Sequence, residues 1–112
     1  MDKRDRMLLL KILDEANIIA DLTKSLDCDA FINDEKTKRA ACMTLINIGE
    51  MVKLLSDKLK QDNPSIAWRS IAGLRDVTAH GYMTLRMEDI WETVAEDVPI
   101  LISQISQLID EA

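Results

Sequence analysis

Apolar side chains recur every three or four residues along most of this chain, and this periodicity limits the fold more than any other feature of the sequence. The clearest example comes last, at Trp91, Val94, Val98, Leu101, Ile105 and Leu108. Such spacing gathers side chains on one face of an α-helix, which repeats about every 3.6 residues, whereas a strand alternates its faces at each residue. The periodicity therefore predicts helices.

Four segments carry this pattern. We interpret them as helices at about Asp5–Ser25, from Asn33 or Asp34 to about Lys60, at Pro64–Ala79 and at Met87–Ile109. With 3 Gly and 2 Pro in 112 residues, the chain has too few turn residues for a β-sandwich or barrel. Long helices with short links favour an all-α fold in one domain, residues 1–112, arranged as an antiparallel up-and-down bundle with a short third helix.

Local features predict where these helices begin, bend or approach one another. Ser25–Asp29 is polar and typical of a turn, and Asn63 can cap a helix whose first position suits Pro64. Gly49 lies inside the second helix, where it costs about 1 kcal/mol relative to Ala, so it indicates a close backbone approach from another helix. Pro99 lacks a backbone N–H and is expected to interrupt and kink the fourth helix.

The chain holds more apolar side chains than one small core needs. Outside the main stripes lie Leu8, Leu10, Ile100, Ile102 and Ile109. A protein of this size cannot bury several such faces alone. We therefore expect a homodimer.

Several classes of protein are excluded by composition. No run of apolar residues is long enough to span a membrane, and acidic residues interrupt the basic start at Met1–Arg6, which is atypical of a signal peptide. Cys28 and Cys42 have no CxxC spacing and no activating neighbours, and with one histidine the chain offers no metal cage. We predict a cytoplasmic protein with inert cysteines and with no metal or cofactor.

The charges of the chain limit which partners it is expected to bind. The chain carries 14 basic and 20 acidic residues, a net charge of −6, which argues against a generic nucleic-acid binder. No Lys or Arg follows Arg86, so a polyanion is expected to meet the first three-quarters of the chain. Candidate RNA contacts are Lys36, Lys38, Arg39 and Arg69, although such charges more often form a solvated face. The acidic fourth segment is either solvated or faces a basic partner.

Arg75, His80 and Tyr82 lie close together and carry the most distinctive chemistry in the chain. Arginine binds phosphate in bidentate fashion, and histidine has an ordinary pKa suited to proton transfer near neutrality. Together they suffice to cleave RNA through its own 2′-OH without a metal. Five residues along a continuous helix separate two side chains by about 140°, so Arg75 and His80 share a face only if the helix ends near His80 or a groove wraps both. Alternatively, His80 caps a helix, Arg75 pairs with an acid and Tyr82 packs.

The run from Ile66 to Tyr82 resembles the signature of the HepT-like branch of the HEPN superfamily. In that signature Trp is followed, after two residues, by Ile-Ala-Gly, one residue and Arg, then by four residues, His, one residue and Tyr. Trp68, Arg75, His80 and Tyr82 occupy these positions. Arg39-Ala40-Ala41 and Ile48-Gly49-Glu50 in the second helix also resemble the family, so the resemblance covers nearly the whole chain.

This resemblance implies an all-helical toxin of a toxin–antitoxin pair that forms homodimers with the motif at or near the interface. Such toxins are metal-independent endoribonucleases, which would make Arg75 and His80 catalytic. Their antitoxin is a minimal nucleotidyltransferase, which in part of the family transfers AMP from ATP to the tyrosine matched here by Tyr82. Asp76 stands where the family commonly has Asn or Asp, and it would orient Arg75 or His80.

Three further side chains are each open to two interpretations. Glu50 either pairs with Arg75 as a supporting residue or is simply exposed. Trp68 and Trp91 are more readily explained as core or dimer anchors than as stacking platforms for bases.

A second function from a different class stays open. The chain could be a binding module that docks a nucleotidyltransferase and is modified by it, with little ribonuclease activity, and the acidic charge balance favours this alternative. An inert structural bundle would leave the coincidence of Arg75, His80 and Tyr82 unexplained.

Overall fold

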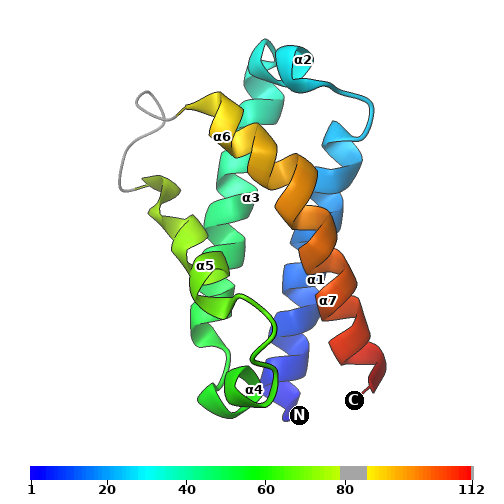
Figure 1. Ribbon diagram of the computed structural model, residues 1–112, viewed down its shortest axis with the longest axis vertical. Coiled ribbons are helices and arrows are strands. Elements are labelled where there is room, and N and C mark those ends of the chain that lie inside the picture. The colour runs from blue at the N-terminus through cyan, green and yellow to red at the C-terminus, as the bar shows by residue number, and fades with distance from the viewer. Residues whose placement is uncertain (79–85, 112) are drawn as a thin grey trace.

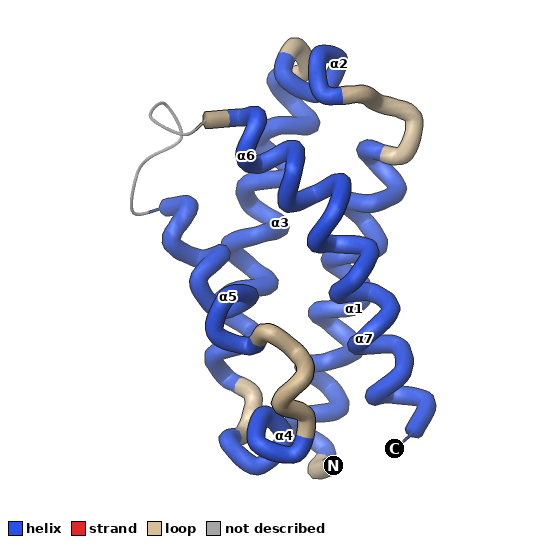
Figure 2. The backbone as a smooth tube through the Cα atoms, in the orientation of Figure 1, coloured by secondary structure: helices blue, strands red, loops and turns tan. Residues whose placement is uncertain are grey.

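The computed structural model describes residues 1–78 and 86–111, apart from the side chains of residues 77 and 78. In these two ranges every element is helical, as Figure 2 shows, which confirms the predicted all-α class. The elements are α1 (Lys3–Thr23), α2 (Cys28–Ile32), α3 (Glu35–Leu54), α4 (Asp57–Asp62), α5 (Trp68–Ala72), the 3₁₀ turn η1 (Gly73–Thr78), α6 (Met87–Glu92), the π-helical turn η3 (Thr93–Asp97) and α7 (Val98–Glu111). Among them, none is both long and apolar enough to cross a membrane.

The longest elements lie side by side along the long axis of the molecule (Figure 1). The chain runs up α1, down α3, up through α5 and η1, and down through α6, η3 and α7. α2 covers one end of the molecule, whereas α4 lies at the other end beside both termini. Helix α3 is central in this arrangement, because α1 packs on one side of it and α5 with η1 on another.

The core forms where the predicted apolar stripes of α1, α3 and α7 meet. Its most completely buried large side chains are Leu9, Ile12, Ile19, Phe31, Leu45, Ile48, Val52, Val98 and Ile105. The stripe of the last helix is buried as predicted from Val94 to Leu108, and Trp91 is half-buried at its start.

The second predicted helix ends earlier than its periodicity indicated. The second helix was expected to continue to Lys60, but α3 ends at Leu54 and Leu55 is extended. A separate helix, α4, begins at Asp57. The cause lies in α1: the buried carboxylate of Asp5 accepts hydrogen bonds from the backbone N–H and the hydroxyl of Ser56. Ser56 in turn caps α4 by accepting a bond from the N–H of Leu59.

Two other helix boundaries also differ from the predicted ones. Residues 28 and 29, expected in a turn, belong to the short helix α2, which Asp27 caps through the N–H of Ala30 at 2.8 Å. The third helix starts at Trp68 and not at Pro64, because the Asn63 side chain bonds backward to the carbonyl of Leu59 instead of capping forward. Of the two N-caps proposed for α3, Asp34 is the one used, and it accepts from the N–H of Thr37 at 3.1 Å.

Pro99 explains the irregular turn in the last helix. A helix interior normally uses every N–H, and Pro99 has none. One residue earlier, Val98 donates its N–H to the carbonyl of Thr93, five residues back, which defines η3 as a π turn. The predicted interruption of the hydrogen-bond ladder is therefore present, and the kink stays a prediction.

Candidate functional site

The position of Arg75 depends on a backbone contact between η1 and α3. A Cβ atom added to Gly49 would lie 2.5 Å from the backbone N of Arg75 and 2.9 Å from the carbonyl oxygen of Ala72. Such distances are shorter than any carbon–nitrogen or carbon–oxygen contact that a side chain can tolerate, so α3 and η1 can approach this closely only at a glycine. The close approach predicted from Gly49 is confirmed, and its partner is the segment that carries Arg75.

Two carboxylates surround the Arg75 guanidinium at distances longer than a hydrogen bond. Its Nη1 lies 3.7 Å from Glu50 Oε1, and its Nε lies 3.8 Å from Asp76 Oδ1. The Arg75 side chain is 43% exposed, and both acids are more exposed still. Exposed ion pairs of this length are weak and screened by salt. Exchanging either of these two carboxylates for a phosphate would therefore cost the guanidinium little.

Glu50 is thus both exposed and close to Arg75. The two interpretations that the sequence left open, pairing with Arg75 and simple exposure, therefore both hold. Asp76, which follows Arg75 in η1, approaches the same guanidinium, and its orienting role remains a prediction. His80 and Tyr82 lie outside the described residues. The convergence of Arg75 with His80 remains an expectation from the sequence.

A groove between α1 and α3 runs past Glu50. It is lined by Lys11, Asp14, Glu15, Ile18, Asn47, Glu50 and Met51. Asn47 was not singled out by sequence reasoning, although its position three residues before Glu50 places both on one side of α3. Its amide donates to Glu15 Oε1 at 2.8 Å and so joins α3 to α1 at this point.

The four candidate RNA contacts do not form one cluster. Lys36, Lys38 and Arg39 lie in the first turns of α3, and Arg69 lies in α5, which packs beside the other half of α3. Lys38 and Arg39 both reach Glu35, at 3.2 Å and 3.1 Å. This acidic residue offsets part of the positive charge at the start of α3.

The tryptophans are packed as structural anchors. Trp68 is buried, and its indole N–H donates to the carbonyl oxygen of Asn63 at 2.9 Å. Trp91 lies against Phe31 with ring centroids 5.3 Å apart. These contacts favour the core interpretation over base stacking.

The cysteines show no sign of activation. Burial raises the pKa of the Cys42 thiol, and partial burial together with Asp29, Glu88 and Asp27 raises the pKa of the Cys28 thiol. Both thiols therefore stay protonated near neutrality, as inert cysteines do. Across residues 1–78 and 86–111, no group of three His, Cys, Asp or Glu side chains is placed to hold a metal ion.

Comparison with known proteins identifies the family. Residues 12–108 match the family described as "Ribonuclease HepT-like". The chain belongs to the HepT-like family. This HepT-like chain is 36% identical over 112 residues to a Methanocaldococcus jannaschii protein named "Putative RNase", with 99% of this chain and 93% of the relative covered.

Two further relatives also have names that describe them as ribonucleases. A Thermococcus cleftensis protein named "Probable ribonuclease HepT" is 31% identical over 108 residues, which cover 96% of this chain and 98% of the relative. A "Putative RNase" of Caldanaerobacter subterraneus is 30% identical over 109 residues, 97% of each chain. No solved structure matches the chain. The HepT-like assignment extends over nearly all of its length and includes Glu50, Arg75, Asp76, His80 and Tyr82.

Proposed function

We propose that this protein is a metal-independent endoribonuclease that uses Arg75 and His80 in a cleft at a homodimer interface. One observation carries the proposal: in a chain of the HepT-like family, the backbone of Arg75 packs closely against Gly49 while its guanidinium remains partly exposed to solvent. An accessible cation on a firmly packed backbone is suited to stabilising charge that develops in a transition state.

The reaction uses RNA as its own nucleophile. One imidazole accepts the proton of a ribose 2′-OH while that oxygen bonds to the adjacent phosphorus, and a second protonated imidazole gives a proton to the departing 5′-oxygen. The products are a 2′,3′-cyclic phosphate and a 5′-OH. Arg75 stabilises the extra negative charge on the phosphoryl oxygens, and Glu50 and Asp76 act as positioning residues through Arg75. A dimer supplies both histidines, one from each copy.

Cleavage of RNA by substituted proteins tests this function. His80→Ala and Arg75→Ala are each expected to lower the cleavage rate about 100-fold or more, because each removes one transition-state interaction. EDTA is expected to leave the rate of the parent protein unchanged. Tyr82→Phe is the matched control in the same segment and should cleave like the parent. Equal rates for His80→Ala and the parent protein would exclude the proposed catalytic role.

We further propose that the protein is the toxin of a toxin–antitoxin pair and that a nucleotidyltransferase silences it by transferring AMP to Tyr82. A phosphate on Tyr82, two residues from His80, would repel RNA and offer Arg75 an anionic partner. Co-expression with a neighbouring nucleotidyltransferase should add one or more adenylate groups to the intact mass, mapped to Tyr82. The Tyr82→Phe protein should gain no mass, and modification elsewhere would contradict the proposal.

The acidic balance of the chain supports a second candidate, a binding module that docks the nucleotidyltransferase and has little ribonuclease activity. With a net charge of −6, such a module is expected not to bind RNA at physiological ionic strength. A ribonuclease should bind RNA with an affinity that falls as salt is raised. RNA titrations of the His80→Ala protein across a salt series separate the two functions.

A further inference from the structure

The part of the chain that leads up to Arg75 carries positive charge and no negative charge. Between Asp62 and Asp76 the sequence contains no acidic residue, whereas it contains Arg69 and Arg75. In a chain with a net charge of −6, this segment is a local concentration of positive charge. Such a surface attracts polyanions.

The contact at Gly49 aligns α5 and η1 along α3. The carbonyl oxygen of Ala72 and the backbone N of Arg75 both approach Gly49, and the chain runs up through α5 and η1 after it has run down α3 (Figure 1). Arg69 precedes Ala72 by three residues, which is about one helical turn. One turn back along α5 therefore lies beside one turn onward along α3.

Lys53 occupies that position on α3. It follows Gly49 by four residues, so it lies on the same side of the helix and one turn further on. Lys53 and Arg69 are both exposed, and within the described part of the chain neither belongs to an ion pair. Lys53, Arg69 and Arg75 thus lie along one line between α3 and α5, which we call the basic row.

We propose that the basic row binds the backbone of the RNA strand beside the scissile phosphate, with Lys53 and Arg69 contacting phosphates that are not cleaved. The inference rests on the proposed function, in which Arg75 contacts the scissile phosphate. Cations placed along a nucleic-acid strand neutralise successive phosphates and release the counterions bound there. The row leads from Arg75 toward α4 and away from α6, η3 and α7, which carry no Lys or Arg.

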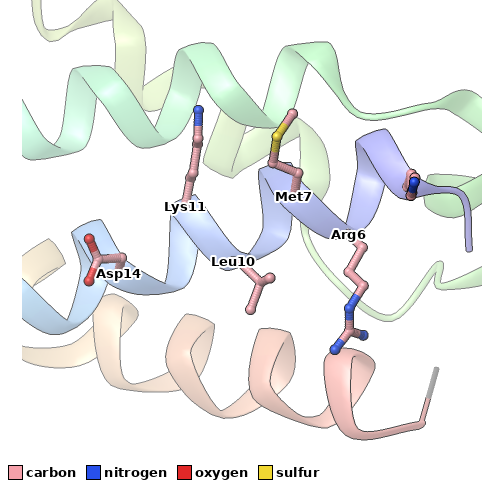
Figure 3. Close-up of a pocket in the computed structure, with 6 residues that line it drawn as sticks. Arg6, Met7, Leu10, Lys11 and Asp14 are labelled. Carbon is pink, nitrogen blue, oxygen red and sulfur yellow. The ribbon is translucent and has the colours of Figure 1, made fainter.

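The basic side chains of α1 do not extend this row. They lie around an open pocket lined by Lys3, Arg6, Met7, Leu10, Lys11 and Asp14. Figure 3 shows Lys11 on the side of α1 that faces α3 and Arg6 on the side that faces α7, where its Nη1 lies 3.5 Å from the carbonyl oxygen of Ile109. Asp14 adds a negative charge to the same pocket. Helix α3 also separates α1 from η1, which carries Arg75.

The salt dependence of RNA binding tests the basic row. In the His80→Ala protein, Lys53→Gln and Arg69→Gln are each expected to weaken binding of a single-stranded RNA. Each should also reduce the slope of log affinity against log salt by about 0.7, because each removes one phosphate contact. Lys24→Gln makes the same charge change at the other end of the molecule and should leave the slope unchanged, since Lys24 is exposed and already pairs with Asp21.

Cleavage of a short and a long substrate separates a phosphate contact from an effect on Arg75. The dinucleotide UpA has a single phosphate, which is the one cleaved, so it cannot reach Lys53 or Arg69. In a protein with His80 intact, Lys53→Gln and Arg69→Gln should cleave UpA like the parent. For a long single-stranded RNA, each should raise KM about two- to fivefold and leave kcat unchanged, because the lost contact holds substrate and transition state equally.

Three results would overturn the proposal: absence of RNA binding, a salt slope that Lys53→Gln and Arg69→Gln do not change, or an equal change in Lys24→Gln. Equal effects on UpA and on long RNA would also overturn it, because the substitutions would then act through Arg75. Cleavage that depends on His80 would leave the proposed function intact in each of these cases where RNA is still cleaved. Conversely, the expected salt slopes without any cleavage would contradict the proposed function and leave the basic row in place.

Discussion

Asp5 shows how a single residue can determine structure far along the chain. Its carboxylate is buried at the start of α1 and accepts the backbone N–H of Ser56 at 2.9 Å as well as the Ser56 hydroxyl. Ser56 in turn provides the N-cap of α4. A buried carboxylate is tolerated because these donors replace the water that it has lost. The break between α3 and α4 therefore depends on one acid more than fifty residues away.

We expect Asp5→Ala to lower the free energy of unfolding by about 1–3 kcal/mol, because the partly buried Ser56 donors would lose their acceptor. Urea denaturation followed by circular dichroism measures this change. Asp62→Ala is the control, since Asp62 is exposed and its ion pair with Lys58 contributes little. Equal loss of stability in both variants would show that the Asp5 contact is not the important one.

The candidate site was only partly predictable at this scale. Arg75 and the close approach at Gly49 follow from residue type and spacing in the sequence, whereas Asp76 was implied by the resemblance to the family. The pairing of Glu50 with Arg75 was one of two alternatives that the sequence left open, because the choice depends on how α3 and η1 pack. Similarly, the involvement of Asn47 depends on Glu15, a residue on another helix.

The elements show which boundaries periodicity can predict. The starts of α1 and α6 agree with the sequence to within a few residues, since their signals are local. The predicted end of the second helix was wrong because a distant contact, from Asp5 to Ser56, competes with the local helical preference. The predicted start of the third helix was wrong because two short-range bonds, from Asn63 to Leu59 and from Trp68 to Asn63, replace a helical turn at Pro64. The 3₁₀ form of η1 was also missed: its apolar spacing fits an α-helix nearly as well.

Gly49→Ala is expected to disturb η1. The added methyl group gives about 1 kcal/mol of helix propensity, but overpacking against the Arg75 backbone costs about 1–3 kcal/mol, so the variant should be less stable. The shift of Arg75 should also slow RNA cleavage more than the loss of stability explains. Denaturation midpoints and cleavage rates at a temperature where the protein is fully folded measure the two effects.

Gly73→Ala provides the matched control, because a Cβ at Gly73 meets nothing within 4 Å. This variant should be as stable as the parent or more stable by about 0.4–1 kcal/mol, since Ala restricts the unfolded chain. If both substitutions had the same effect, the close approach of α3 to η1 would not be what positions Arg75.

For the molecule as a whole, the apolar surplus predicted from the sequence is only partly exposed: Leu10 and Ile100 are exposed, whereas Leu8 is buried and Ile102 and Ile109 pack against the core. Most of the large apolar side chains that are exposed among the described residues lie on α1 and α3 instead. Sequence periodicity could indicate that such a surplus exists but not where it lies. Its position depends on which sides of α1 and α3 are used by the core, and thus on the complete packing of the helices.

If two copies form each cleft, the rate of RNA cleavage per molecule should fall when the protein is diluted below its dimer dissociation constant. Cleavage rates across a dilution series, compared with sedimentation at the same concentrations, measure the effect. A constant rate per molecule through the dissociation range would mean that one copy is sufficient.

Both ends of the chain lie at the same pole of the molecule, beside α4 (Figure 1), and Arg6 Nη1 lies 3.5 Å from the carbonyl oxygen of Ile109. In a homodimer whose copies lie antiparallel, the termini of the two copies would therefore occupy opposite poles. Helix α1 has 21 residues, so its length is about 32 Å. A fusion of two copies in one chain would consequently need a linker of about ten residues or more to span that length. With a shorter linker, each copy could pair only with a copy from another molecule.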